Sequence, residues 1–183
     1  MIIALFGVTC VGKTTIGKIL GEKLGYEFYD LDTEMKLFYN DKMTNIFSDC
    51  ICRHAIDTKK TSVLQDVINK CGNNAIIAVS PIYYTNTYKQ MLKNVLSIVL
   101  QDEPGNIADR MIYTDDDDNV IEGYKIDRKQ EIRDVKHFIS QYKRAYSKIQ
   151  QHYNIGGKTA IEAADEIIET IIRSEILVRE GGQ

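Results

Sequence analysis

The sequence predicts an α/β protein in which a five-stranded parallel β-sheet is flanked by helices. Two observations lead to this prediction. Five short apolar segments alternate with helical patterns along the 183 residues, as parallel strands joined by helical crossovers do. The first segment, Ile2–Phe6, also runs directly into a glycine-rich turn and then a helical pattern. Neither an internal repeat nor a linker interrupts the chain, so we expect a single domain over residues 1–183.

The glycine-rich turn, GVTCVGKTT, matches the phosphate-binding pattern G-x-x-x-x-G-K-[ST]. Glycine lets the backbone approach a phosphate closely, so successive N–H groups can surround an anion at the start of a helix. Lys13 is placed to reach the outer phosphates of a nucleotide, and the Thr14 hydroxyl can bind Mg²⁺. The predicted nucleotide-binding residues are Gly7, Thr9, Cys10, Val11, Gly12, Lys13, Thr14 and Thr15.

Two acidic residues follow the first helix. That helix is expected over Thr15–Leu24, where Ile16 and Leu20 recur at helical spacing and Gly25 gives a stop. We then expect an extended strand, Tyr26–Asp32, that carries both aspartates of D-L-D on one side. Because the carboxyl ends of parallel strands meet at the sheet edge where phosphates bind, a carboxylate here can hold Mg²⁺ through water.

The remaining segments continue the alternation. Residues 33–72 carry helical patterns for two or three helices, which is more than a simple crossover needs. Four consecutive aspartates within residues 112–126 repel one another and favour an exposed loop, which can be either a lid or a solvated tip. The further strands are expected at Asn74–Ser80, Asn94–Leu100 and His152–Ile155, and the further helices from Pro104, over Asp127–Gln151 and after a Thr159 cap.

Composition limits the partners and the location. The formal net charge of −3 offers no basic surface for nucleic acid. No apolar run approaches 18 residues, and Met1 leads straight into a strand, so we expect neither a membrane span nor a signal peptide. We predict a cytoplasmic monomer or weak homodimer whose four cysteines are free thiols. These are Cys10, Cys50, Cys52 and Cys71.

Over Met1 to Phe47 the chain resembles the shikimate kinases, small P-loop kinases of the nucleoside monophosphate kinase type. The segments that carry the resemblance are IIALFGVTCVGKTT, GYEFYDLD and NIF, with weaker similarity in NIADRM and QYKRAY. It implies a three-layer P-loop kinase fold with strand order 2-3-1-4-5, ATP and Mg²⁺ as cofactors, and a small-molecule hydroxyl acceptor. Lys13 would then be catalytic and bind the β- and γ-phosphates, and Thr14 would ligate the metal.

The same resemblance assigns the other site residues. Asp32 would be catalytic, hold the metal through water and lie near the acceptor hydroxyl. Arg110 would be a catalytic residue beside the adenine and phosphates. Glu34 and Arg144 would bind the acceptor, Arg144 through a carboxylate, and the helical insertion of residues 33–72 would hold that acceptor.

Three departures from the family pattern concern the acceptor side. Val79-Ser80-Pro81 stands where the family has G-G-G, and the arginine expected after I-F has no aligned partner, Arg53 being only a neighbour. The lid motif R-P-L-L is also missing. Three basic residues are candidates to replace its arginine: Lys125, Arg128 and Arg133.

We therefore predict a kinase that transfers the γ-phosphoryl group of ATP to the hydroxyl of a small molecule. Three alternatives remain open at this point. One is a kinase for a nucleoside, a nucleotide or a polyol, and another is a nucleotide-binding protein that has lost transferase activity. The third is a GTPase, because Asp102-Glu103-Pro104-Gly105 matches D-x-x-G after a strand, although no N-K-x-D motif follows.

Overall fold

The computed structural model describes residues 1–83, 86–115, 119–121 and 127–181. Its strands are β1 (Ile2–Phe6), β2 (Glu27–Asp30), β3 (Ala75–Ala78), β4 (Val95–Gln101) and β5 (Gln151–Asn154). Its helices are α1 (Lys13–Leu24), α2 (Leu31–Tyr39), α3 (Met43–Phe47), α4 (Arg53–Lys70), α5 (Asn86–Met91), α6 (Pro104–Ala108), α7 (Arg128–Tyr146), α8 (Ala160–Ile167) and α9 (Arg173–Gly181). A π-helical turn, Ile168–Ile172, joins α8 to α9.

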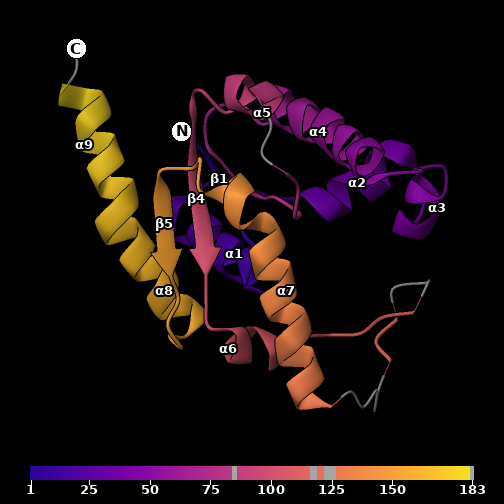
Figure 1. The fold of residues 1–183 in the computed structure, drawn as a ribbon. Helices are drawn as coiled ribbons and strands as arrows, with labels where there is room; N and C mark the ends of the chain where they lie inside the picture. The colour runs from indigo at the N-terminus through magenta and orange to yellow at the C-terminus, as the bar shows by residue number, and fades with distance from the viewer. Residues whose placement is uncertain (84–85, 116–118, 122–126, 182–183) are drawn as a thin grey trace.

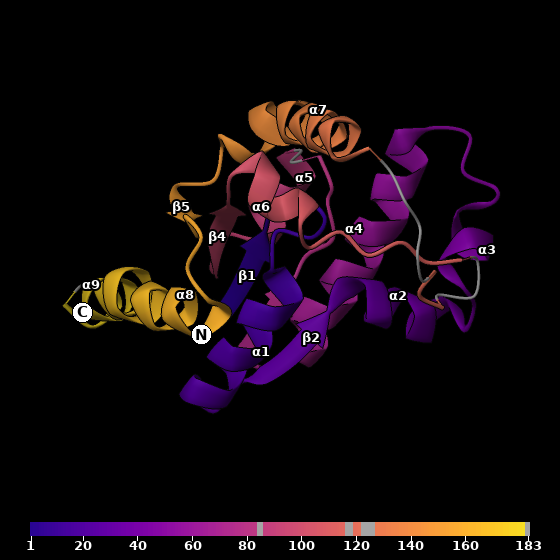
Figure 2. The same cartoon turned by 90° about the horizontal axis from the view of Figure 1, so that it is seen from below.

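The strands form one parallel sheet with the order β2-β3-β1-β4-β5. Helices cover both of its faces, as Figure 2 shows: α1 and α8 lie on one side, and α4, α5 and α7 lie on the other. In Figure 1 the strands β4 and β5 point toward the end of the molecule where α6 lies. The predicted three-layer fold and its strand order are confirmed.

The central strand β1 forms the middle of the core. Its residues Ile3–Phe6 are all buried, as expected for a parallel strand with helices on both faces. Helix α1 packs closely against the neighbouring sheet because it carries glycine where it crosses β2. A Cβ at Gly17 would lie 2.5 Å from Cε2 of Phe28.

The segment after β2 differs from the prediction. Strand β2 ends at Asp30, and helix α2 begins at once, so the expectation of an extended D-L-D segment is wrong. Asp30 is the N-cap of α2: its Oδ1 accepts hydrogen bonds from the backbone N–H of Asp32 (3.1 Å) and of Thr33 (3.4 Å). Aspartate is among the best N-cap residues, and this local preference overrides the strand pattern. Asp32 therefore lies in the first turn of a helix.

The structure describes the whole of the helical insertion, residues 33–72, but only part of the acidic segment, residues 112–126. Helices α2, α3 and α4 lie within residues 31–70, and they are grouped together at the upper right of Figure 1. Of the acidic segment, Thr114 and Val120 form an antiparallel bridge, and the Asp115 N–H donates to the carbonyl of Asn119 (3.0 Å). Asp116 to Asp118 lie outside the described residues, so the lid and the solvated tip both stay predictions.

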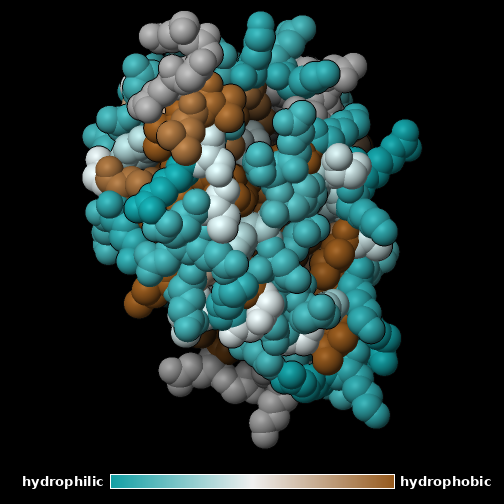
Figure 3. All heavy atoms as spheres, turned by 90° about the vertical axis from the view of Figure 1, so that its left-hand side faces the viewer, coloured by the Kyte–Doolittle hydropathy of each residue, from teal (hydrophilic) through white to brown (hydrophobic). Residues whose placement is uncertain are grey.

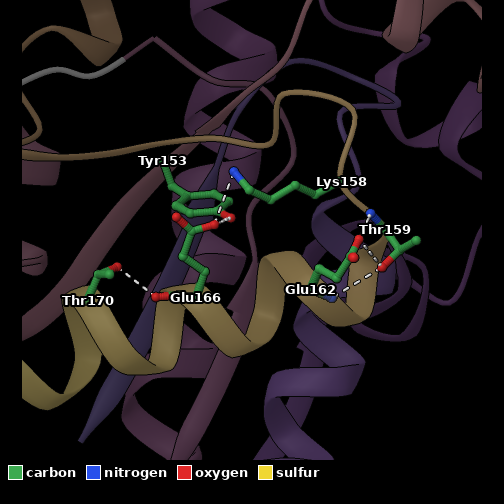
Figure 4. Close-up of polar contacts among 6 residues, drawn as sticks. All are labelled: Tyr153, Lys158, Thr159, Glu162, Glu166 and Thr170. Atoms are coloured by element: carbon green, nitrogen blue, oxygen red, sulfur yellow. Dashed lines mark hydrogen bonds and ion pairs between the residues drawn. The ribbon is translucent and has the colours of Figure 1, made fainter.

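The turn from β5 to α8 is held by side chains (Figure 4). Thr159 Oγ1 accepts from the Glu162 N–H (3.3 Å), and the Glu162 carboxylate accepts from the Thr159 N–H (2.9 Å). This capping box satisfies two of the donors that a helix start leaves free, and it confirms the predicted cap. One turn further on, Glu166 accepts from the Tyr153 hydroxyl (2.8 Å) and pairs with Lys158 (3.0 Å).

The face formed by α8 and α9 is mainly hydrophilic, with separate hydrophobic areas (Figure 3). Its exposed large hydrophobic side chains are Ile161, Leu177 and Val178. Among the described residues, no helix is both long enough and apolar enough to cross a membrane.

Candidate active site

The loop between β1 and α1 has the geometry that its glycines predict. The backbone takes positive φ angles at Gly7 (143°), Cys10 (60°) and Gly12 (112°). A Cβ at Gly7 would lie 2.7 Å from the carbonyl oxygen of Leu100 and 2.8 Å from Cγ1 of Val11. No other residue fits at Gly7 without displacing backbone, so the close turn depends on glycine.

Lys13 is buried at the base of this loop. Its Nζ donates hydrogen bonds to the carbonyl oxygens of Gly7 (3.0 Å) and Val8 (2.8 Å). Burial lowers the pKa of Lys13 from 10.5 to about 8, and the nearby carboxylates of Asp32 and Asp30 oppose that shift. The two carbonyl oxygens carry only partial negative charge, so they compensate the charge of the buried ammonium incompletely. A bound anion would compensate it better.

The Thr14 hydroxyl donates a 2.7 Å hydrogen bond to Oδ2 of Asp30. The resemblance implied Asp32 as the metal-holding carboxylate, and in the structure it is Asp30 that contacts the threonine directly. Asp32 is exposed in the first turn of α2, close enough for its charge to oppose the lowering of the pKa that burial causes in both Lys13 and Lys60. The hydroxyl and these two carboxylates supply hard oxygen ligands of the kind that Mg²⁺ prefers, so the residues present fit that metal.

Arg110 joins the phosphate-binding loop to the end of β4. Its Nε donates to the carbonyl oxygen of Cys10 (3.1 Å), and its Nη2 pairs with Oδ2 of Asp102 (2.6 Å). Burial favours a raised pKa for Asp102, but hydrogen bonds from Asn106 and Arg110 outweigh it and lower the pKa. Arg110 therefore lies beside the loop, and its place next to the adenine and phosphates stays a prediction. Asp102, on which the GTPase alternative depended, pairs with this arginine and not with Thr14.

The other residues assigned from the resemblance pair with residues outside the loop, are exposed, or lie outside the described residues. The Glu34 carboxylate pairs with Lys70 (2.5 Å), at the contact between α2 and α4. Arg144 is exposed on α7. Of the candidates to replace the lid arginine, Arg128 pairs with Asp109, Arg133 donates to Gln130 (2.6 Å), and Lys125 lies outside the described residues.

A cavity of about 140 Å³ opens on the other side of the loop. It is lined by Thr9 from the loop, Arg53 and Lys60 from α4, Pro81 after β3, and Tyr142 from α7, together with Val8 and Phe138. The Arg53 guanidinium lies 5.8 Å from the centre of the Tyr142 ring. Charged groups from α4 therefore converge on a space that borders the phosphate-binding loop.

The sequence analysis missed two buried charged residues in α4. Asp57 is 6% exposed and Lys60 is 8% exposed, although both carry charges. Their spacing along the sequence could have revealed them, because both positions fall on the same buried stripe of the helix as Val63, Leu64 and Val67. Charged residues at positions that the helical period assigns to the core are rare, and they indicate a function or a buried partner.

A larger cavity of about 590 Å³ lies behind the loop, between the carboxyl ends of β4 and β5 and helix α7. Its lining includes Val11, Leu100, Ile107 and Ile139, and it is mainly apolar. The Asp102 side chain at its border is neutralised by Arg110. The smaller cavity is lined by two cations, Arg53 and Lys60, and by no carboxylate, whereas Asp102, Glu103 and Lys143 all border the larger one.

A parallel sheet with this strand order, a phosphate-binding loop after β1 and the Lys13, Thr14 and Asp30 constellation define a P-loop kinase. The particular family follows from comparison with known proteins: the model of the shikimate kinase family matches residues 9–172. The chain belongs to the shikimate kinase family. Members of this family are phosphotransferases with an alcohol acceptor, so the predicted family and enzyme class are confirmed.

Relatives support this assignment along most of the chain. A shikimate kinase from Bacillus licheniformis is 25% identical over 169 residues, which cover 92% of both chains. A shikimate kinase structure from Bacteroides thetaiotaomicron superimposes with a TM-score of 0.74 at 19% identity, covering 93% of this chain and 97% of that one. One from Acinetobacter baumannii, in complex with shikimate, gives 0.71 at 22% identity, covering 94% and 93%. At these identities the two structures show a shared fold.

Proposed function

We propose that the protein transfers the γ-phosphoryl group of ATP to a hydroxyl group of a small molecule. The observation that carries the proposal is the buried Lys13, held by its own loop beside the Thr14–Asp30 pair. Phosphoryl transfer passes through a loose transition state, so catalysis depends mainly on positioning and on charge neutralisation. The constellation around this loop is suited to both tasks.

Each residue has a defined part in this reaction. The N–H groups of residues 9–15 and Lys13 bind the phosphates, and Arg110 supports the loop at Cys10 and adds positive charge. Thr14, with Asp30 and Asp32, would hold Mg²⁺, which would neutralise charge on the transferring group. Asp32 orients the acceptor hydroxyl and takes its proton as the new O–P bond forms, while the bond from the γ-phosphorus to the bridging oxygen breaks and ADP leaves.

We assign the acceptor to the 140 Å³ cavity between the loop, α4 and α7. Shikimate is the first acceptor to test, because the curated relatives are named shikimate kinases. The replacement of the family's glycine run by Val79-Ser80-Pro81, next to this cavity, favours testing nucleosides, nucleotides and polyols beside it.

The test is an ATP-consumption assay with that panel of acceptors and Mg²⁺. At least one acceptor is expected to be phosphorylated, and Lys13→Ala is expected to abolish turnover while the fold remains intact by circular dichroism. Lys18→Ala, an exposed position on the same helix, is the matched control and should keep wild-type turnover. Retained turnover in Lys13→Ala would refute the mechanism. Binding of Mg·ATP without turnover on any acceptor would favour the alternative of a nucleotide-binding protein that has lost transferase activity.

A further inference from the structure

Asp102, just after β4, is a buried carboxylate that the proposed reaction does not use. Its side chain is 0% exposed. Oδ1 accepts hydrogen bonds from the Glu103 N–H (2.8 Å) and from Nδ2 of Asn106 (2.8 Å), and Oδ2 accepts from Nη2 of Arg110 (2.6 Å). The bonds to Oδ1 fix the carboxylate to the start of α6. Asp102 is therefore a rigid, charged acceptor for the arginine.

Arg110 carries the position of this carboxylate to the phosphate-binding loop. Its Nη2 is held by Asp102, and its Nε donates to the carbonyl oxygen of Cys10 (3.1 Å). Because the guanidinium is planar and its donors are fixed in a fork, the direction of one N–H determines that of the other. The Arg110 side chain is 37% exposed, so it can turn into water when the carboxylate no longer holds it.

The residue at the other end of this contact, Cys10, has an unfavourable backbone conformation, with φ at 60°. The Val11 N–H donates to the Val8 carbonyl (3.4 Å), so Cys10 is the third residue of a turn, where a type II turn requires a positive φ and favours glycine or asparagine. Among the described residues, the other non-glycine residue with positive φ is Asn40, the C-cap of α2, where this conformation is common. Cysteine disfavours the left-handed conformation by about 5- to 30-fold, so its neighbours must stabilise it.

The hydrogen bond from Arg110 to Cys10 provides this stabilisation. Because the peptide group is planar, holding the Cys10 carbonyl also fixes the following N–H, which closes the turn. We propose that Asp102 is a positioning residue: it orients Arg110, and Arg110 holds Cys10 in the left-handed conformation that shapes the phosphate-binding loop. The inference rests on the function proposed above, because the shape of the loop acts there through the binding of Mg·ATP. The family resemblance assigns Asp102 no role.

Asp102→Asn separates this positioning role from a simple effect of charge. The amide oxygen still accepts from Glu103 and Asn106, but the amide NH₂ cannot accept from Arg110. If only charge mattered, the arginine would lose its neutralising partner and the anionic nucleotide would bind more tightly. Positioning predicts the opposite, because Cys10 loses its support. We expect the Kd for Mg·ATP, measured by calorimetry, to rise about 5- to 30-fold.

Cys10→Gly provides a rescue that general damage to the fold would not show. Glycine takes a positive φ without steric cost, so the loop no longer needs the arginine to hold this conformation. The four proteins of a double-mutant cycle are the wild type, Asp102→Asn, Cys10→Gly and the double variant. In the Cys10→Gly background, Asp102→Asn should raise the Kd by no more than about twofold, which is within the usual error of such a cycle.

Two further variants serve as control and as second route. Asp165→Asn removes an aspartate that pairs with Lys23 (2.7 Å), at the end of α1 opposite the loop, and should keep the wild-type Kd. Thermal unfolding shows whether each variant is folded. If Asp102→Asn does not fold, Arg110→Lys makes the same test, because it keeps the charge and loses the planar fork. It should also weaken binding and be rescued by Cys10→Gly.

The proposal is overturned if the folded Asp102→Asn variant binds Mg·ATP as tightly as the wild type or more tightly. It is also overturned if the loss of affinity is equally large in the Cys10→Gly background, because Asp102 then does not act through Cys10. Both results leave the proposed function standing as long as the wild type binds Mg·ATP. A wild type that does not bind Mg·ATP refutes the proposed function, and this inference with it.

Discussion

The titration of Lys13 offers a direct test of the phosphate-binding loop. Burial lowers its pKa to about 8, so the free protein carries a charged ammonium at neutral pH and a neutral amine well above that value. Phosphates bind the charged form. Raising the pH through 8 should therefore weaken nucleotide binding, with the loss setting in above the lowered pKa and not near 10.5.

The size of the effect follows from that value. With a pKa of about 8, roughly nine-tenths of Lys13 is protonated at pH 7 and roughly one-tenth at pH 9, so the Kd for Mg·ATP should rise about tenfold between them. Binding at pH 9 should also take up close to one proton per nucleotide, because the ligand restores the charge.

Calorimetry in buffers of different ionisation enthalpy measures both quantities. Lys13→Arg provides the control: a guanidinium stays charged throughout this range, so the variant should show no such pH dependence. An equal Kd at pH 7 and pH 9 for the wild type, with no proton uptake, would refute the argument that Lys13 is the desolvated cation of the site.

Three further outcomes are expected. Gly17→Ala should lower the free energy of unfolding by about 1–3 kcal/mol in urea titrations, because its Cβ would lie 2.5 Å from Phe28; unchanged stability would mean that the α1–β2 contact is loose. Asp30→Asn keeps a good N-cap but removes the charge beside Thr14, so the affinity for Mg²⁺ in the nucleotide complex should fall about 10- to 100-fold, and an unaltered metal titration would contradict the role of Asp30. Thr159→Ala should cost about 1 kcal/mol by loss of the capping box, measured by thermal unfolding, and would leave nucleotide binding as it is.

The features that the sequence predicted well are those encoded locally. The run from Ile2 to Leu24 contains its own strand pattern, turn glycines and helix pattern, and the structure matches it to within two residues. The sheet order followed from the family resemblance. By contrast, the strand pattern of Tyr26–Asp32 competed with a capping preference at Asp30, and the cap prevailed.

The acceptor side could not be predicted in the same way, because its residues come from separate helices. Lys60 and Arg53 lie on α4 and meet Tyr142 of α7 only through the packing of these helices around the sheet. Sequence similarity at the end of α7 drew attention to Arg144, but the helical period turns Tyr142 inward and leaves Arg144 exposed. The charged residues Asp57 and Lys60, at positions that the helical period assigns to the core, were the signal that the sequence offered for this side of the site.

The carbonyl oxygens under the phosphate-binding loop each have a reserve donor. Besides Lys13, the Gly7 oxygen accepts from the Tyr146 hydroxyl (3.2 Å), and the Val8 oxygen accepts from the Val11 N–H (3.4 Å). If a bound anion draws the ammonium away, each oxygen still accepts a hydrogen bond from its second donor. The penalty of about 1–3 kcal/mol for an orphaned acceptor is thereby avoided. The ammonium can thus move from the loop to a ligand and back, and the carbonyl oxygens of Gly7 and Val8 stay hydrogen-bonded in both states.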